Sequence, residues 1–143
     1  MCKYKDSRDI KITEIGSDER GKFISLIDDS IRNVSIIESE KGVIRSNHYH
    51  HKDFHYMHVL VGEIDYFYRK KDSNIIKYMK ITSGQTIFTP PNEIHSCFFP
   101  IFTRLIVCNG LSRDKETYEK DTVRVEFVNK NNVQELLNKY EKN

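Results

Sequence analysis

The stretch GVIRSNHYHHKDFHYMHVLVG (residues 42–62) contains five of the six histidines of this chain. His48 and His50 are two positions apart, so on a strand their side chains point to the same face. Residues 51–54 can turn the chain, and the next strand then carries His55 at the start of an alternating apolar face. The stretch therefore predicts two adjacent strands that bring three histidines together.

The same alternation sets the other two histidines of the stretch aside. His51 is one position from His50, and His58 is three positions from His55, so both point to the opposite face. The apolar residues expected on the inward face after His55 are Met57, Val59 and Val61.

A second stretch, GQTIFTPPNEIHSCFF (residues 84–99), supplies a fourth histidine. The turn at residues 90–92, Pro-Pro-Asn, reverses the chain, and His95 then opens the returning strand, with Cys97 and Phe99 on its face. Neutral imidazole is a common protein ligand for zinc, iron, nickel, copper and manganese. The two stretches predict a site for one of these divalent transition metals. Its predicted ligands are His48, His50, His55 and His95.

Length and composition restrict the class of protein. At 143 residues, with 38% hydrophobic and 31% charged residues, the chain suits one soluble globular domain. The net charge of +2 gives no reason to expect nucleic acid or a membrane surface as a partner. No apolar run approaches the roughly 20 residues that span a bilayer, and the first residues lack a signal-peptide core. We expect a cytoplasmic protein.

The three cysteines, Cys2, Cys97 and Cys108, have no CxxC spacing and are odd in number, which argues against a disulfide framework. Cys97 and Cys108 lie in apolar runs, where a free cysteine behaves as a small buried hydrophobic residue.

Short apolar or alternating runs recur about every ten residues, and strand breakers such as Gly16-Ser17-Asp18 separate them. The predicted strands cover residues 22–27, 34–37, 57–61, 64–69, 75–81, 85–89, 95–99, 103–108 and 122–127. A single apolar stripe predicts one helix at residues 131–142. The pattern indicates one all-β domain, residues 1–143, with a barrel core at about residues 18–128 and a short C-terminal helix.

The intervals within the two stretches resemble the two motifs of the cupin superfamily. The matching positions are Gly42, His48, His50, His55 and Gly62 in the first motif and Gly84, Pro90 and His95 in the second. This resemblance implies a jelly-roll β-barrel with a metal in its mouth. Three positions depart from the motifs, because His55 stands in place of Glu, Asn92 in place of Gly and Phe99 in place of Asn. An all-nitrogen site favours borderline transition metals over magnesium or calcium.

Other segments resemble small RmlC-like cupins, in particular nucleotide-sugar 3,4-ketoisomerases and epimerases of polysaccharide biosynthesis. These segments are Asp18 to Phe23, Arg45 with the following His-x-His, and Ser112 to Asp121. The resemblance implies an enzyme that removes a proton next to a sugar carbonyl, with a sugar nucleotide as its substrate.

Carried over by position, His50 or His48 is the base, and Arg45 holds the diphosphate or the sugar. A histidine that binds a metal cannot also accept a proton, so other bases stay open. These are Tyr56, Tyr66, His51 and Glu93. We take Tyr56 as the additional catalytic candidate, and Tyr66 and Glu93 as candidates for substrate binding beside Arg45.

Two other classes of function stay open: a non-catalytic sugar- or metal-binding module, and a metal-dependent dioxygenase. A mouth lined only by apolar residues around the ligands would favour the binding module. Aromatic residues expected on outer strands (Tyr66, Phe67, Tyr68, Phe98 and Phe99) would leave either apolar patches or open strand edges, and a two-fold homodimer would cover both.

Overall fold

The computed structural model describes residues 8–10 and 13–140 of the chain. The elements within these ranges are β1 (Arg8–Ile10), β2 (Thr13–Asp18), β3 (Gly21–Ser25), β4 (Asn33–Ser39), β5 (Ile44–His50), β6 (His55–Val61), β7 (Glu63–Lys70), β8 (Lys77–Thr82), β9 (Thr86–Thr89), β10 (Glu93–Phe98), β11 (Thr103–Asn109), α1 (Lys115–Asp121), β12 (Thr122–Arg124) and α2 (Val133–Tyr140).

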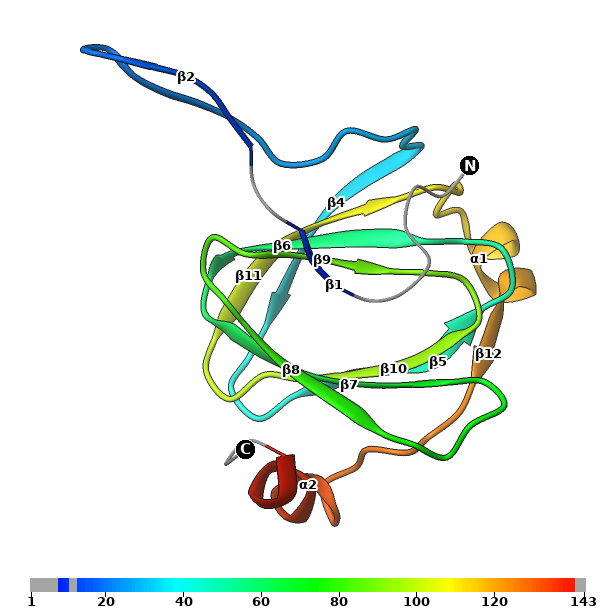
Figure 1. Cartoon of the computed structure of the whole chain (residues 1–143). Helices are drawn as coiled ribbons and strands as arrows, with labels where there is room; N and C mark the ends of the chain where they lie inside the picture. Colours follow the sequence, from blue (N-terminus) through cyan, green and yellow to red (C-terminus); the bar gives the residue numbers. More distant parts are fainter. Residues whose placement is uncertain (1–7, 11–12, 141–143) are drawn as a thin grey trace.

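Two five-stranded sheets face each other and form the barrel (Figure 1). Their strand orders are β1-β9-β6-β11-β4 and β12-β5-β10-β7-β8, and neighbouring strands run antiparallel. The chain crosses repeatedly from one sheet to the other. Strands β4, β6, β9 and β11 belong to the first sheet, and β5, β7, β8 and β10, which alternate with them along the sequence, belong to the second. The predicted jelly-roll barrel is confirmed.

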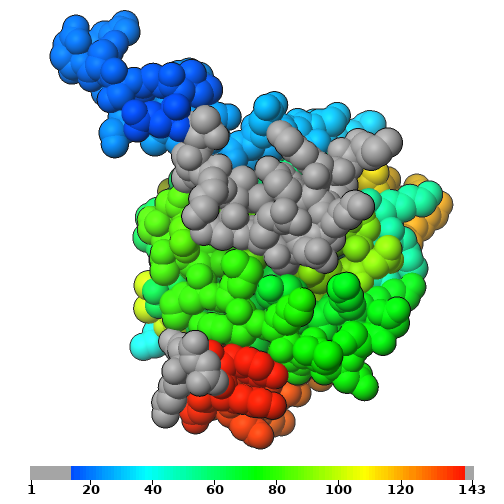
Figure 2. Space-filling model, in the orientation of Figure 1, coloured from blue at the N-terminus to red at the C-terminus, as the bar shows by residue number. Residues whose placement is uncertain are grey.

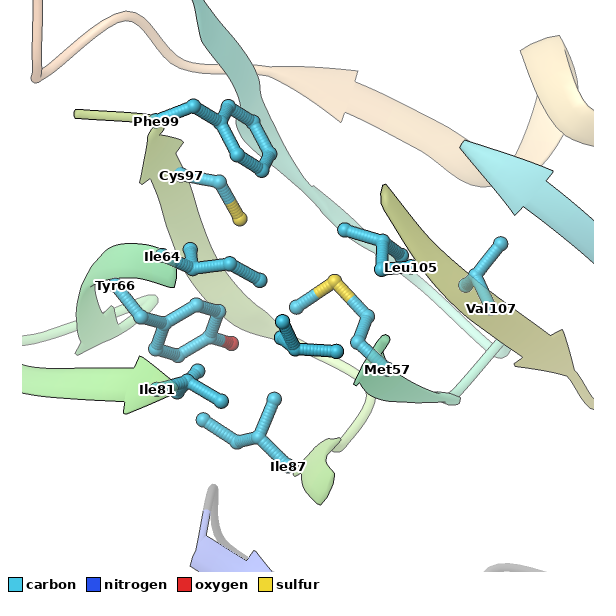
Figure 3. Packing of buried hydrophobic residues seen from close by; sticks show 10 residues of the cluster. Met57, Ile64, Tyr66, Ile81, Ile87, Cys97, Phe99, Leu105 and Val107 are labelled. Atoms are coloured by element: carbon cyan, nitrogen blue, oxygen red, sulfur yellow. The ribbon is translucent and has the colours of Figure 1, made fainter. Parts of the chain in front are cut away.

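The core lies between the two sheets (Figure 3). Its buried members are Met57, Val59, Ile64, Tyr66, Ile81, Ile87, Cys97, Phe99, Leu105 and Val107. Each fully buried aliphatic or aromatic side chain contributes roughly 1.5–3 kcal/mol. The inward face predicted after His55 is confirmed at Met57 and Val59. It is wrong at Val61, which is 55% exposed because β6 ends there at the turn into β7.

The cysteine prediction is confirmed for the two residues that the structure describes. Cys97 and Cys108 are free and buried, and burial raises the pKa of the Cys97 thiol to about 12. Cys2 lies outside the described residues.

At two positions of the motifs, a positive φ restricts which residue can stand there. Gly62, between β6 and β7, has a φ of 100°, and a Cβ there would lie 2.4 Å from the Thr103 hydroxyl. Asn92, which replaces a glycine, has a φ of 65°, a left-handed conformation that Asn tolerates. Both turns keep the geometry that the motifs require.

Each of the nine predicted strands overlaps an observed one, and β5 is the strand that the His-x-His spacing requires. The breaker assigned to Gly16-Ser17-Asp18 is wrong, because these residues continue β2 and the turn follows at residues 19–20. β2 and β3 pair with each other as a hairpin that extends away from the barrel (Figures 1 and 2). The expected start of the barrel near residue 18 therefore falls inside this hairpin.

The predicted C-terminal helix is present as α2, and residues 141–142 lie outside the described chain. Val133 and Leu137 of α2 pack with Phe67 and Val128 against the outer face of a sheet. The expectation of exposed aromatic patches is wrong for this reason, since α2 covers Phe67. Tyr66 and Phe99 point into the barrel and are also buried.

Helix α1 was not predicted, because one tyrosine among six polar or charged residues gives no apolar stripe. Its start is marked by Asp114, whose side chain accepts a hydrogen bond from the Thr117 backbone N–H at 2.9 Å. No helix in the described part of the chain is long and apolar enough to cross a membrane.

Candidate active site and metal centre

Three histidines meet inside one end of the barrel. A ring nitrogen of each of His48, His50 and His95 lies within 4.8 Å of the others. β5 and β10 are neighbouring strands, and His48 is the Cα partner of His95. The turn of the second stretch is held to the same place, because the Asn92 backbone N–H donates to the His50 carbonyl at 2.8 Å.

A backbone irregularity just before His48 changes the direction of β5 and of the side chains that follow. Ser46 and Asn47 have φ values of 74° and 55°, and the pairing register shifts between His95 and Ser96. The Asn47 side chain holds the bulge, since it donates to the Val128 carbonyl at 2.8 Å. Bulges of this kind redirect side chains next to active sites, and simple strand alternation does not reveal them.

His55 enters the cluster from the opposite sheet. Its Nε2 lies 3.4 Å from His95 Nε2, while its Nδ1 is buried and has no hydrogen-bond partner among the described residues. The four histidines that the sequence singled out therefore lie together, with the fourth next to His95.

The hydrogen-bond partner of His95 fixes where its proton is. His95 Nδ1 lies 3.0 Å from the Glu93 carbonyl, which can only accept, so Nδ1 carries the hydrogen and Nε2 carries a lone pair. Two arrangements then suit the contact between the Nε2 atoms of His55 and His95. Either His55 donates to His95, or both lone pairs face one ion.

Burial keeps all four imidazoles neutral. It lowers the pKa of His48 to about 2, with smaller contributions from His95 and His50 and from two nearby arginines. It lowers the pKa of His50 and of His95 to about 4, and the pKa of His55 well below its ordinary value. Neutral imidazoles are the form that binds metals.

Tyr66 and Glu93 lie beside the cluster. The Tyr66 ring stacks on His95, and its hydroxyl lies 3.1 Å from Glu93 Oε2 and 2.6 Å from Thr89 Oγ1. All three polar groups are buried. The structure thus brings both predicted substrate-binding residues of this pair to the histidines.

Glu93 also forms part of the wall of a pocket of about 370 Å³. Arg69, Lys70 and Lys77 also line this pocket, so three cationic residues contribute to its wall. This combination suits a ligand that carries negative charge.

The comparisons with known proteins agree with this architecture. No family model and no curated protein matches the chain by sequence. Among solved structures, a double mutant of the 3,4-ketoisomerase QdtA from Thermoanaerobacterium thermosaccharolyticum in complex with TDP is similar, with 22% identity, coverage of 85% of this chain and 88% of that one, and a TM-score of 0.67. A 3,4-ketoisomerase from Helicobacter canadensis has 16% identity, covers 85% and 92% of the two chains, and has a TM-score of 0.69. The rmlC epimerase of Mycobacterium tuberculosis has 14% identity, covers 87% and 70%, and has a TM-score of 0.67.

The fold is that of an RmlC-like cupin. Near the histidines the barrel also carries cationic and aromatic residues that the strand pattern did not reveal. Arg113 stacks over the Tyr118 ring at 4.3 Å, and that ring lies 5.7 Å from the His50 ring. Arg124 lies opposite His48 on β12. The signal for Arg113 and Tyr118 was the segment from Ser112 to Asp121, which resembles ketoisomerases.

Tyr56 does not join the histidines at this end of the barrel. Its hydroxyl donates to Asp29 at 2.7 Å, and its ring packs against Phe54 and Phe88 in a separate cluster. Strand alternation explains this position, because Tyr56 follows His55 directly and points to the other face of β6. The prediction of Tyr56 as a catalytic residue is therefore wrong, because its hydroxyl and ring lie away from the histidines.

Arg45 is also not brought to the cluster. It is exposed, and its guanidinium donates to Ser39 Oγ at 2.7 Å and to the Glu38 carbonyl at 3.0 Å. It ties β5 to the end of β4, while Arg113 and Arg124 supply the positive charge near the histidines.

The two histidines that alternation set aside lie outside the cluster. His51 is exposed, and the ring of His58 contacts the Thr86 hydroxyl at 2.9 Å, away from the other four. The four histidines that the sequence singled out are thus the four that lie together, and their role as metal ligands stays a prediction.

Proposed function

We propose that this cupin is a metal-binding isomerase or epimerase that moves a proton next to the keto group of a sugar nucleotide. The observation that carries the proposal is the cluster of four buried, neutral imidazoles beside the Tyr66–Glu93 pair. Proteins with similar structures include sugar 3,4-ketoisomerases and an epimerase, which supports the same class of reaction.

The residues present fit a divalent transition metal. His48, His50 and His95 supply three ring nitrogens, and His55 is placed to supply a fourth. The 3.4 Å between the Nε2 atoms of His55 and His95 is the separation of two ligands on one tetrahedral ion with bonds of about 2.0–2.1 Å. When bound, such an ion polarises the sugar carbonyl and stabilises the charge that develops on its oxygen. Zinc, iron, nickel, copper and manganese all accept imidazole ligands.

The proton then needs an acceptor other than a metal-bound histidine. We assign this role to Glu93, because it is buried, lines the pocket, and contacts Tyr66, whose ring stacks on His95. Glu93 takes the proton from the carbon next to the keto group, which leaves an enediolate. In an isomerisation Glu93 returns this proton to the former carbonyl carbon, while the hydroxyl proton of the neighbouring carbon passes to the former carbonyl oxygen. In an epimerisation a water molecule supplies a proton to the opposite face of the same carbon, and Glu93 releases its own proton to solvent. Tyr66 holds Glu93 through its hydroxyl.

Glu93, Tyr66, Tyr118 and Arg113 give the mouth a polar lining around the histidines, which favours an enzyme over a binding module. The cationic pocket beside Glu93 suits the diphosphate of a nucleotide. The free, buried Cys97 and Cys108 agree with a reducing compartment, and we propose a cytoplasmic location.

A second mechanism has one observation in its favour. The contact between His55 and His95 can be a direct hydrogen bond without any ion. In that case His48 and His50 keep free lone pairs, and one of them is the base. Metal content separates the two mechanisms.

The deciding experiment is metal analysis of the purified protein after incubation with each metal and removal of the excess. We expect about one transition-metal ion per chain in the wild type and in His58→Ala, and little in His95→Ala. His58 is the matched control, because it is a buried histidine outside the cluster. A wild type that takes up no metal would reject the metal site and favour the histidine base.

The substrate class is tested separately by thermal shift with dTDP, UDP, GDP and CDP. A ligand at a hundred times its dissociation constant stabilises a protein by about 2.7 kcal/mol. We therefore expect a clear shift with one of these nucleotides, and the absence of a shift with any of them would count against a sugar nucleotide.

We also propose that the chain forms a homodimer, through apolar surface other than that expected from the sequence. Ile15, Phe23 and Ile24 are exposed on the β2–β3 hairpin, which stands away from the barrel (Figure 2). Val34 and Ile36 are exposed on β4, the last strand of its sheet. An isolated two-stranded hairpin is marginally stable in water, so this arrangement calls for a partner surface.

A further inference from the structure

Thr122 lies directly across from His50. It follows α1 as the first residue of β12, and its backbone is extended, with φ of −106° and ψ of 129°. Thr122 is the Cα partner of His50 in the antiparallel pairing of β12 with β5. Directly opposite residues in such a pair point to the same face, so the threonine hydroxyl meets the imidazole ring. Thr122 Oγ1 lies 3.1 Å from His50 Nδ1.

The single hydrogen of this hydroxyl is already used. Thr122 Oγ1 donates to the Tyr118 carbonyl at 2.6 Å, and a carbonyl oxygen can only accept. Thr122 therefore accepts from His50, and the hydrogen of the neutral ring must be on Nδ1. Asp121 Oδ2, at 3.8 Å from the same Nδ1, favours the same placement by its negative charge.

We propose that Thr122 is a positioning residue that fixes His50 in the tautomer with hydrogen on Nδ1, so that Nε2 presents its lone pair to the cluster. That a metal or a substrate uses this lone pair rests on the proposed function. The tautomer of His50 follows from its hydrogen bond alone and requires neither the metal nor the substrate. The Glu93 carbonyl does the same for His95. The ring of His48, in contrast, makes no hydrogen bond to another residue in the described part of the chain.

The opposite tautomer would place an N–H where a ligand or base needs a lone pair. Partners that orient a metal-binding histidine typically change metal affinity by 10–100-fold when they are removed. The chain offers a matched control, since Thr86 Oγ1 makes the same kind of contact with His58 Nδ1 outside the cluster, at 2.9 Å.

The test is long-range proton–nitrogen-15 NMR of the metal-free protein at neutral pH, which reports which ring nitrogen carries the hydrogen. We expect His50 to carry it on Nδ1 in the wild type. In Thr122→Val, loss of one hydrogen bond should lower the ratio of the Nδ1–H tautomer of His50 to the Nε2–H tautomer by about three- to tenfold. Thr122→Ser keeps the hydroxyl and should restore the wild-type ratio, and Thr86→Val should change the signals of His58 alone.

A second readout is zinc affinity by competition with a chelator. We expect a 10–100-fold loss in Thr122→Val and a much smaller loss in Thr122→Ser. The proposal is overturned if wild-type His50 carries its hydrogen on Nε2, or if Thr122→Val leaves the ratio unchanged in a folded protein. A protein that shows the expected tautomers but binds no zinc would uphold the positioning role and reject only the metal.

Discussion

At the scale of single residues, the site is a group of titratable side chains whose roles are set by their neighbours. Four imidazoles are neutral because they are buried, and two of them have a fixed tautomer. Glu93 is a carboxylate of the same region, and it contacts Tyr66. The proposed metal ligands are therefore histidines, and the proposed proton acceptor is a glutamate.

Glu93→Gln removes the proposed proton acceptor and keeps the size of the side chain. General-base catalysis contributes about 10²–10⁴-fold, so we expect proton exchange at the sugar to fall by at least about 100-fold. The measurement is deuterium uptake from solvent into TDP-4-keto-6-deoxyglucose, the sugar nucleotide bound in a QdtA mutant structure, followed by NMR. Glu126→Gln, at an exposed position, is the control. Equal exchange in Glu93→Gln and wild type would exclude Glu93 as the base.

The lowered pKa values also predict how the metal-free protein responds to acid. The ordinary pKa of 6.5 applies to His50 in the unfolded chain, and about 4 applies in the folded one. Between these values the unfolded state binds more protons, so the free energy of unfolding falls as the pH drops from about 6.5 towards 4. At about 1.4 kcal/mol per pKa unit, His50 accounts for a loss of about 2–3 kcal/mol between pH 7 and pH 4.5.

Urea unfolding at the two pH values measures this loss. His50→Gln should make the pH dependence smaller by about that amount, whereas His51→Gln, at an exposed ring, should leave it close to that of the wild type. An identical pH dependence in His50→Gln and wild type would contradict the burial argument.

The sequence predicted the four clustered histidines because strand alternation is a local property of the backbone. It did not predict Thr122, Tyr118 or Arg113 as neighbours of His50, because these contacts depend on how α1 and β12 return to β5. It also did not show that Arg45 is bonded to β4, since the turn between the two strands sets that contact.

At the scale of elements, the turn between β6 and β7 depends on Gly62. In Gly62→Ala the added carbon would meet the Thr103 hydroxyl and backbone and the Phe102 carbonyl, in addition to the strain of a positive φ. We expect a loss of about 3 kcal/mol or more in the free energy of unfolding. Gly84→Ala has a similar φ, 89°, but open space around the new carbon, so it should cost only about 1–2 kcal/mol. Urea unfolding measures the loss in both variants. Equal losses would show that the positive φ, and not the contact of the new carbon with its neighbours, sets the cost.

The helix α2 is predicted to stabilise the barrel through its buried side chains. Leu137→Ala should lower the free energy of unfolding by about 2–3 kcal/mol, because Leu137 is buried against Phe67 and Val128. Glu135→Ala on the exposed side of α2 should change it by less than about 0.5 kcal/mol. A loss in Leu137→Ala no larger than in Glu135→Ala would mean that α2 contributes little to stability.

Most strands could be predicted, because β-branched and aromatic runs between turn residues are local signals. The β2–β3 hairpin was predicted only in part. Gly16 and Ser17 are typical turn residues, yet here they continue β2 beside a register shift opposite β3. Glycine in a strand next to an irregular pairing cannot be distinguished from a turn by composition alone.

At the scale of the whole molecule, exposed apolar side chains were expected from the sequence, but they lie on a different surface from the one predicted. Phe67 was expected on an open outer strand, and α2 covers it instead. The packing of α2 is a tertiary contact between segments about seventy residues apart, which no local pattern contains. The apolar surface that is exposed lies on the hairpin and on β4.

The proposed homodimer is tested through Phe23, which is 64% exposed on the hairpin. In a dimer this ring is removed from water, and Phe23→Asp would place a charge in the interface, which is unfavourable without a partner. We expect the wild type to have the mass of a dimer in size-exclusion chromatography with light scattering, and Phe23→Asp to have the mass of a monomer at the same micromolar concentration. Ile75→Asp is the matched control, because Ile75 is 71% exposed in the loop between β7 and β8 and should leave the dimer intact. A monomeric wild type, or a Phe23→Asp protein that is still a dimer, would show that the hairpin does not form the interface.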